Sequence, residues 1–283
     1  MKLVWANHRF DFSQRTYIMG ILNVTPDSFS DGGRYLDHSL AIKRALQMVE
    51  DGADIIDIGG ESTRPGSDPV PAEEELRRTI PVIETLSKEI RIPISIDTYK
   101  AGIAKRALDS GASMVNDISG LRFDPEMAGT VAAHRVPVVL MHIKGTPKNM
   151  QQSPTYDALI PDILQYLKES MTIAGKAGIL EDVIIIDPGI GFAKTFEHNL
   201  EIINNLDKFR SLGKPVLIGP SRKAFIGRIL GNVPTEERIE GTAAAVAISI
   251  MNGANIIRVH DVKEMARVAK VADAVKRMKI STL

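Results

Sequence analysis

The 283-residue sequence contains no cysteine, so disulfide bonds and thiolate metal sites are excluded. It also has no excess charge, because 35 Lys and Arg residues balance 35 Asp and Glu residues. Without a net field, nucleic acid and acidic membrane surfaces are not attracted in bulk, and any anion must be bound by a local site. The sequence has no apolar signal-peptide segment near its start and no run approaching the roughly 18 apolar residues of a membrane span. We therefore expect a soluble cytoplasmic protein.

Several catalytic motifs are missing as well. The sequence has no H-E-x-x-H zinc motif, no calcium-binding loop, no G-x-S-x-G nucleophile turn and no G-x-x-x-x-G-K-[ST] phosphate loop. The chemistry must therefore be sought in the spatial arrangement of side chains rather than in one of these short motifs.

The sequence does contain a repeat of short apolar segments and longer amphipathic segments. Eight apolar segments predict strands, at residues 17–24, 53–60, 92–98, 113–119, 136–142, 183–189, 215–221 and 255–260. Amphipathic segments predict helices at residues 38–52, 72–89, 100–111, 124–135, 235–253 and 262–278. Eight such βα units favour an α/β fold of the (β/α)8 TIM-barrel type over a doubly wound open sheet.

We expect residues 1–283 to form a single domain. Residues 1–15 alternate around an Asn7–His8 turn and predict a short β-hairpin at the barrel bottom, while residues 16–283 predict the barrel. Long Pro- and Gly-rich connections follow the first, second and fifth barrel strands, at residues 25–37, 61–74 and 144–157. Loops of this length in a compact domain are typical of lids and binding sites.

Polar residues occur at the end of one strand after another. In chain order they are Asn23, Glu61, Thr63, Asp97, Asn116, His142, Asp187, Ser221, Lys223, Arg258 and His260. One such residue is often only a turn former or a helix cap. A set distributed over all eight strands indicates a ligand pocket, because the carboxyl ends of barrel strands meet at the face where barrel enzymes carry their active sites.

The residue types in this set suit a ligand with two different parts. Acids and amides can accept and donate along the edge of a polar heterocycle, and they include Asp97, Asn116 and Asp187. Basic groups suit a phosphate or a carboxylate, and they include Arg64, Lys223, Arg258 and His260. Because Arg258 and His260 are two apart on a strand, both can face the same anion.

Eight stretches occur in the order GILNVTPDSFSDGG, DIGGESTRPGS, SIDT, NDISG, LMHIKGTPKNMQ, DPGIGFAKT, GPSRKAFIG and IIRVHDV, and they span residues 20–262. In this order they resemble the dihydropteroate synthase family of bacterial folate biosynthesis. The resemblance implies a (β/α)8 barrel, a homodimer, and a reaction that joins p-aminobenzoate to hydroxymethyl-dihydropterin diphosphate with release of pyrophosphate. It also implies that sulfonamides act as mimics of p-aminobenzoate.

The same resemblance implies roles for individual residues. The pterin-binding positions are Asp97, Asn116, Met141, Asp187, Phe192 and Lys223. The diphosphate-binding positions are Asn23, Arg64, Arg258 and His260, with Asn23 as the ligand of a Mg²⁺ ion that enters with the diphosphate. The p-aminobenzoate-binding positions are Phe29, Thr63, Arg64, Pro65, Phe192, Ser221 and Lys223. The positions expected to act in catalysis are Asp31, Arg64, Asp97 and Lys223, and a departure from the family is Ala193, where Gly is common.

Three alternative functions stay open. A methyltetrahydrofolate-dependent corrinoid methyltransferase uses the same barrel and pterin pocket, but it has no diphosphate for Arg258 and His260 to bind. A non-catalytic pterin-binding barrel would be indicated by loss of Asn23, Arg64 or Asp97, all of which are present. A Schiff-base aldolase could use Lys223, but that lysine follows GPSR as in the synthase motif.

Overall fold

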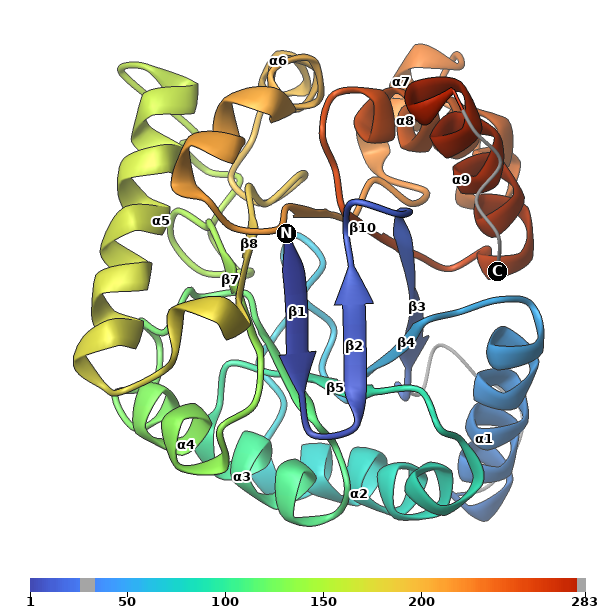
Figure 1. Cartoon of the computed structure of the whole chain (residues 1–283), viewed down its shortest axis with the longest axis vertical. Coiled ribbons are helices and arrows are strands. Elements are labelled where there is room, and N and C mark those ends of the chain that lie inside the picture. The colour runs from blue at the N-terminus through green and yellow to red at the C-terminus, as the bar shows by residue number, and fades with distance from the viewer. Residues whose placement is uncertain (26–33, 279–283) are drawn as a thin grey trace.

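A ring of parallel strands forms the centre of the computed structural model, which describes residues 1–25 and 34–278 (Figure 1). The eight strands are β3 (Tyr17–Asn23), β4 (Ile55–Gly59), β5 (Ile94–Asp97), β6 (Met114–Asp117), β7 (Val138–Met141), β8 (Ile184–Asp187), β9 (Leu217–Ile218) and β10 (Ile256–Val259). Each lies within one of the segments that the sequence predicts. Their branched apolar residues are almost completely buried, as in parallel strands that are covered on both faces.

The sheet closes on itself. Neighbouring strands pair in the order β8-β7-β6-β5-β4-β3-β10-β9, and a parallel bridge between Ile186 and Val216 joins the two ends of this order. The Ile186 N–H donates to the carbonyl of Pro215 at 3.0 Å. In the described residues each barrel strand is thus paired on both sides, so the barrel prediction is confirmed and the open doubly wound sheet is wrong.

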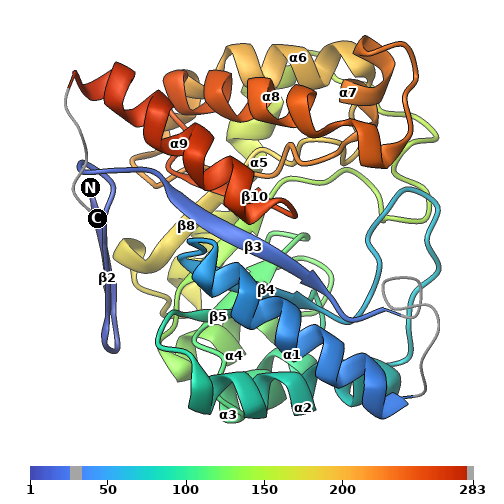
Figure 2. The same ribbon diagram turned by 90° about the vertical axis from the view of Figure 1, so that its right-hand side faces the viewer.

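Helices surround the barrel on the outside (Figures 1 and 2). They are α1 (Arg34–Glu50), α2 (Ala72–Glu89), α3 (Ala101–Asp109), α4 (Met127–His134), α5 (Leu159–Lys176), α6 (Phe196–Asn204), α7 (Ala224–Ile229), α8 (Ile239–Met251) and α9 (Val262–Arg277), with short 3-10 helices at η2 (Glu181–Val183), η3 (Leu206–Leu212) and η4 (Thr235–Glu237). In residues 1–25 and 34–278, no helix has the length and apolar character needed to cross a membrane.

Helix α2 illustrates how the sequence forms this outer layer. The helix starts after Pro71, and the acidic residues 73–75 lie in its first turn, where the positive end of the helix dipole favours them. Ile80, Ile83 and Leu86 recur at helical spacing and are buried against the barrel. The observed bounds equal those expected from the amphipathic pattern.

The N-terminal hairpin consists of β1 (Lys2–Trp5) and β2 (His8–Asp11), and it lies across the amino-terminal ends of the barrel strands (Figure 2). Trp5 pairs directly with His8, so the turn is Ala6–Asn7, one residue earlier than the expected Asn7–His8 turn. A shift by one residue would move each side chain to the opposite face of the hairpin. The observed register keeps Leu3, Trp5 and Phe10 on the barrel side.

An aromatic cluster fills the space between the hairpin and the barrel. Leu3 and Phe10 are paired across the hairpin and both are buried. The ring of Phe10 stacks on Tyr17 with centroids 4.2 Å apart, and Trp5 and Phe12 contact Phe10 edge-on. The hairpin therefore acts as a plug for the barrel bottom, as its position in the sequence predicts.

Replacing Phe10 with alanine should destabilise the fold. Loss of a buried ring leaves a cavity and should lower the free energy of unfolding by about 3 kcal/mol, measured by urea-induced unfolding. The matched control is Val4→Ala on the solvent side of the same hairpin, which should leave the unfolding midpoint nearly unchanged. Equal midpoints for the two variants would contradict the role of the hairpin as a plug.

Candidate active site

Strand register brings several predicted site residues into one layer at the carboxyl ends of the strands. Asn23 on β3 pairs with Gly59 on β4, Gly59 pairs with Asp97 on β5, and Asp97 pairs with Asn116 on β6. A Cβ atom at Gly59 would lie 3.6 Å from Cβ of Asp97 and 3.8 Å from Oδ1 of Asn23. The glycine therefore leaves space between the Asn23 amide and the Asp97 carboxylate.

Arg258, on β10, binds two carboxylates inside the barrel mouth. Its Nε donates to Oδ2 of Asp57 at 2.6 Å, and its Nη2 donates to Oδ2 of Asp97 at 2.5 Å. Nδ2 of Asn116 donates to the same Asp57 oxygen at 3.0 Å. Residues from four strands thus form one hydrogen-bonded network, and three of the four, Arg258, Asp97 and Asn116, were predicted as site residues.

Sequence reasoning missed Asp57, the fourth member of this network. Asp57 lies in the middle of β4 between isoleucines and is completely buried. Its position does contain a signal, because a carboxylate inside a strand buried on both faces needs a charged or hydrogen-bonding partner. The identity of that partner, 201 residues away in the chain, has no local sequence signal.

The network has one cation for two carboxylates. Burial raises the pKa of Asp97, Arg258 opposes that rise, and the neighbouring Asp57 adds to it. Burial alone would lower the pKa of Arg258, but Asp57 and Asp97 outweigh it, so the guanidinium stays charged. Oδ1 of Asp57 and Oδ1 of Asp97 are buried and have no hydrogen-bond partner among the described residues. These oxygens are available acceptors for the donors of a ligand.

Asp187 and Lys223 provide the charged groups on the opposite side of the mouth. Asp187 ends β8, and its Oδ1 accepts from the backbone N–H of Gly189 at 2.7 Å. Burial raises the pKa of Asp187 to about 6, while the Gly189 bond and Lys223 oppose the rise. Nζ of Lys223 donates to the carbonyl of Ile190, and burial lowers the pKa of this amine to about 8. A buried strand thus ends in a carboxylate whose charge depends on its immediate partners.

Two glycines allow the segment after Asp187 to pack tightly. Gly189 has a φ of +74°, and a Cβ there would lie 2.0 Å from the carbonyl oxygen of His142. Gly191 has a φ of +81°, and a Cβ there would lie 2.9 Å from Cδ of Lys223. Ala193 also has a positive φ, 51°, which accounts for the preference for glycine that the resemblance implies at this position.

A buried amine and imidazole support this segment from behind. Nζ of Lys194 lies 2.9 Å from Nδ1 of His142 and donates to the carbonyl of Phe192 at 2.7 Å. Burial lowers the pKa of both groups, to about 2 for His142 and well below the usual value for Lys194. His142 therefore lies at the end of its strand as expected, but its Nδ1 is used to hold the loop that carries Phe192.

Apolar side chains line the mouth beside these charges. A small cluster, separate from the main core, contains Ile118, Met141, Ile143, Met150 and Ala193, with the partly buried Tyr99, Phe123 and Phe192 packed on it. Met141 pairs with Asp187 in the sheet, and Nζ of Lys223 lies 4.6 Å from the centre of the Phe192 ring. The structure thus brings Met141, Phe192, Asp187 and Lys223 together, as predicted.

Ser221 and His260 form a pair next to Arg258. Oγ of Ser221 lies 3.0 Å from Nδ1 of His260 and accepts from the His260 backbone N–H at 3.2 Å. Burial and, to a lesser extent, the nearby charge of Arg258 lower the pKa of His260 to about 4. At neutral pH the charge at the end of β10 is therefore that of Arg258, and His260 is a neutral hydrogen-bonding group.

The remaining predicted residues lie on loops or outside the described ranges. Thr63 is half-buried, and Arg64 and Pro65 are exposed on the loop between β4 and α2. Phe29 and Asp31 lie outside residues 1–25 and 34–278. Within those ranges, no three His, Asp or Glu side chains are placed to hold a metal ion. The predicted Mg²⁺ site therefore depends on Asn23 and on oxygens from a ligand.

A family model described as pterin binding enzyme matches residues 19–260. Because this match covers most of the sequence, the chain belongs to the pterin-binding enzyme family. A dihydropteroate synthase from Bacillus subtilis is 54% identical over 263 residues, covering 93% of this chain and 90% of that protein.

Solved structures agree with this relationship. Dihydropteroate synthase from Clostridium difficile, in the presence of pteroic acid, superimposes with a TM-score of 0.90 at 48% identity, covering 95% of this chain and 99% of that one. The Xanthomonas albilineans enzyme with 4-aminobenzoic acid gives 0.91 at 42% identity, covering 97% and 98%. Within its family the chain therefore belongs to the dihydropteroate synthases, which makes it a transferase of folate biosynthesis.

Removing the Asp57 carboxylate should destabilise the protein. Asp57→Ala leaves Nε of Arg258 without its acceptor, and breaking a buried pair costs about 3 kcal/mol, measured by urea-induced unfolding. Asp68→Ala removes an exposed ion pair with Lys148 and is the control, with no measurable change expected. An Asp57→Ala midpoint equal to that of the control would show that the network does not support the fold.

Proposed function

We propose that this chain joins p-aminobenzoate to hydroxymethyl-dihydropterin diphosphate, forming dihydropteroate and releasing pyrophosphate. The observation that carries the proposal is the buried set of Asp97, Asn116 and Asp187 at the barrel mouth, next to Lys223 and Arg258. Acids and amides complement the N–H and C=O groups of a pterin edge, while the basic groups complement a diphosphate. Relatives solved with pteroic acid and with 4-aminobenzoic acid support this assignment.

Each part of the pterin has a partner in this arrangement. Asp187 accepts from the amino and ring N–H groups, since a carboxylate has about four acceptor sites and only one is taken by Gly189. Met141 and Phe192 pack on the flat ring, and Lys223 lies beside Phe192 with its charge near the ring edge. These contacts orient the methylene carbon toward the loops that carry the amine-binding residues.

The difficult part of the reaction is departure of the diphosphate, not activation of the amine. The bond that breaks joins the pterin methylene carbon to a diphosphate oxygen, and the bond that forms joins that carbon to the aryl nitrogen, whose proton passes to solvent. An aryl amine has a free lone pair at neutral pH, so no strong base is needed. In a dissociative step, the Asp97 carboxylate stabilises positive charge on the pterin and Arg258 stabilises negative charge on the leaving group.

Arg258 can serve both the protein and the diphosphate. Two of its five N–H groups donate to Asp57 and Asp97. The planar guanidinium directs its other N–H groups away from these two bonds, so they can donate to a diphosphate. His260, neutral and bound to Ser221, adds a hydrogen-bonding group without a charge. This division of roles is consistent with the predicted diphosphate site at the end of β10.

We also propose that a Mg²⁺ ion binds together with the diphosphate, as the family resemblance implies. Mg²⁺ typically uses one or two protein oxygens together with phosphate oxygens and water. The Asn23 amide would hold it, and the Asp97 carboxylate lies across Gly59 from that amide, since a Cβ at Gly59 would be 3.8 Å from Oδ1 of Asn23 and 3.7 Å from Oδ2 of Asp97. When bound, the ion would supply positive charge to the leaving diphosphate.

The two substrates should bind in a fixed order. The pterin-binding groups lie on strand ends, whereas Thr63, Arg64 and Pro65 lie on a loop above them. A loop that contacts the second substrate closes productively only after the first has filled the mouth, so we expect pterin diphosphate to bind before the amine.

Amine-dependent release of pyrophosphate tests the proposal. Purified protein is incubated with hydroxymethyl-dihydropterin diphosphate and Mg²⁺, with and without p-aminobenzoate, and pyrophosphate and dihydropteroate are measured together. Release that requires the amine, in equal amounts with dihydropteroate, is the expected result. Tight pterin binding without product would contradict the synthase function.

Substitution of Arg258 should weaken binding of the diphosphate part of the ligand more than binding of the pterin part. Arg258→Ala should weaken binding of the pterin diphosphate by about 3 kcal/mol, because a charged contact to the anion is lost, and should change binding of the bare pterin much less. Calorimetry with both ligands measures the difference. An equal loss for both would mean that Arg258 acts only by supporting the barrel mouth.

We also propose a homodimer, as the family resemblance implies, formed through one apolar face of the barrel. Exposed apolar side chains gather on α6, after α7 and on α8, and they include Leu200, Leu230, Ile248 and Met251. A cavity of about 620 Å³ lies among the same helices and is lined mainly by apolar residues, including Phe225 and Ala244. An apolar surface of this kind is typical of protein–protein contacts.

Ile248→Glu should convert the dimer to a monomer, because it places a charge at the centre of this face. Size-exclusion chromatography with light scattering measures the mass. Leu180→Glu, at an exposed apolar position outside this face, is the control and should stay dimeric. A wild-type monomer, or an unchanged mass for the Ile248 variant, would contradict the proposed interface.

A cytoplasmic location completes the proposal and stays a prediction. It is compatible with a sequence that has no cysteine to oxidise.

A further inference from the structure

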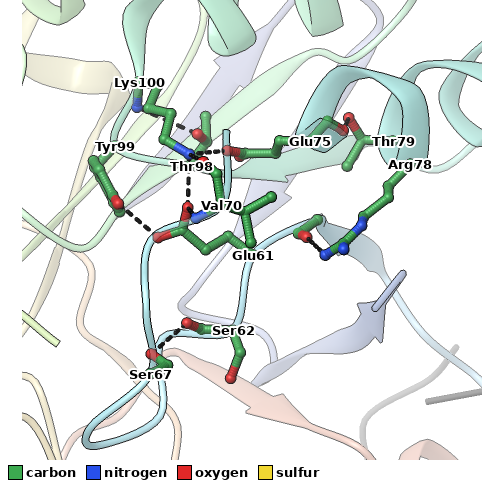
Figure 3. A network of polar contacts seen from close by, with 11 residues as sticks. Glu61, Ser62, Ser67, Val70, Glu75, Arg78, Thr79, Thr98, Tyr99 and Lys100 are labelled. Carbon is green, nitrogen blue, oxygen red and sulfur yellow. Dashed lines mark hydrogen bonds and ion pairs between the residues drawn. The ribbon is translucent and has the colours of Figure 1, made fainter. Parts of the chain in front are cut away.

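A buried cluster of charges, the loop clamp, holds the base of the loop between β4 and α2 (Figure 3). It consists of Glu61, Glu75, Tyr99, Lys100 and the backbone of Val70. Nζ of Lys100 donates to Oε2 of Glu61, Oε2 of Glu75 and the carbonyl of Val70, each at 2.6 Å. Glu61 also accepts from the Val70 N–H at 2.9 Å and from the Tyr99 hydroxyl at 2.6 Å. The start and the end of the loop are thus joined in one network.

The clamp is buried to a degree that stability alone does not explain. The side chains of Glu61 and Glu75 are 6% and 1% exposed, and that of Lys100 is 20% exposed. Burial alone would lower the pKa of Lys100, but the two glutamates outweigh it and keep the amine charged. Desolvation of buried charges offsets most of their attraction. The principal effect of such a network is therefore a fixed geometry of the groups that it joins.

The part of the loop beyond the clamp keeps its shape mainly through its own contacts. Oγ of Ser67 donates to the carbonyls of Ser62 and Arg64 at 2.6 and 2.8 Å. The Gly66 N–H donates to the carbonyl of Pro147 at 3.0 Å, on the loop after β7. Residues 62–69 therefore form a compact arc, which the clamp holds at its base and which contacts the loop after β7 through the Gly66–Pro147 hydrogen bond and the exposed Lys148–Asp68 ion pair.

The clamp is connected to the pterin side of the site by a short segment. Lys100 follows Asp97 by three residues, and its backbone N–H donates to Oγ1 of Thr98 at 3.2 Å. The Thr98 N–H donates to the carbonyl of Asn116 at 3.1 Å, which fixes the segment to β6. One rigid segment thus has the pterin-site carboxylate at one end and the cation of the clamp at the other.

We propose that Lys100, acting through Glu61 and Glu75, is the positioning residue of the amine site. It fixes the arc that carries Thr63 and Arg64 relative to Asp97, and it has no contact with the pterin. This inference rests on the proposed function, because it assigns the arc to the second substrate. A misplacement of about 1 Å at such a loop is sufficient to slow a reaction considerably.

The Michaelis constants of the two substrates provide the test. Lys100→Met should raise KM for p-aminobenzoate about tenfold, while Kd for the pterin diphosphate, whose proposed binding positions other than Arg64 lie at strand ends, should change less than about threefold. Lys100→Arg retains the charge and should return KM to within about threefold of the wild type. An equal rise in the amine KM and the pterin diphosphate Kd would overturn the proposal, since it would mean a general loss of structure.

Two further variants keep the test decisive. Lys105→Met removes the exposed Lys105–Asp109 ion pair on α3, the helix that follows Lys100. It should leave the amine KM and the pterin diphosphate Kd unchanged. Tyr99→Phe removes only the hydroxyl that holds Glu61, keeps the ring contact with Phe123, and should raise the amine KM about threefold. If Lys100→Met does not fold, an unchanged amine KM in Tyr99→Phe overturns the proposal.

Hydrogen exchange separates this inference from the proposed function. Backbone amides in residues 62–70 should exchange at least about tenfold faster in Lys100→Met than in the wild type and be unchanged in Lys105→Met. Unchanged exchange in Lys100→Met would overturn the clamp even if the enzyme is active. Faster exchange in a protein that releases no pyrophosphate would uphold the clamp and contradict only the synthase function.

Discussion

Arg258 binds two buried carboxylates at the mouth of the barrel, and the arrangement of the site depends on this ion network. Asp57 and Asp97 come from neighbouring strands, and burial, together with the nearby Asp57, raises the pKa of Asp97 while Arg258 opposes that rise. The planar guanidinium holds them with two bonds in different directions, from β10. Because Asn116 donates to the same Asp57 oxygen, one hydrogen-bonded network links Arg258 to three other polar side chains.

The other side of the mouth is built differently. Asp187 has a backbone N–H as its hydrogen-bond partner and the Lys223 charge nearby, so burial leaves its pKa at about 6. The ionised carboxylate therefore keeps acceptor sites for a ligand that brings further N–H donors. One side of the pocket has an arginine shared by two carboxylates, and the other has a carboxylate with a lysine nearby. The pocket therefore offers both acceptors for N–H groups and basic groups for an anion, although the sequence has no net charge.

The sequence predicts where residues lie along the barrel better than where their side chains point. The recurring apolar segments predict all eight strands, and the polar residues at their ends predict the face that carries the site. Asp57 was missed because it lies within a strand, where apolar neighbours indicate core. Glu61 and His142 are strand-end residues as expected, but they bind Lys100 and Lys194 respectively, behind the pocket lining. Such partners come from distant segments, and periodicity contains no information about them.

We expect the buried carboxylate at the end of β8 to become fully ionised when it accepts hydrogen bonds from the pterin. Calorimetric titration of bare hydroxymethyl-dihydropterin at pH 6, in buffers with different ionisation enthalpies, measures the protons released on binding. With a pKa of about 6, Asp187 is half protonated before binding, so the wild type should release about half a proton more than Asp187→Asn. Equal proton release by the two proteins, or net uptake by the wild type relative to the variant, would contradict the account.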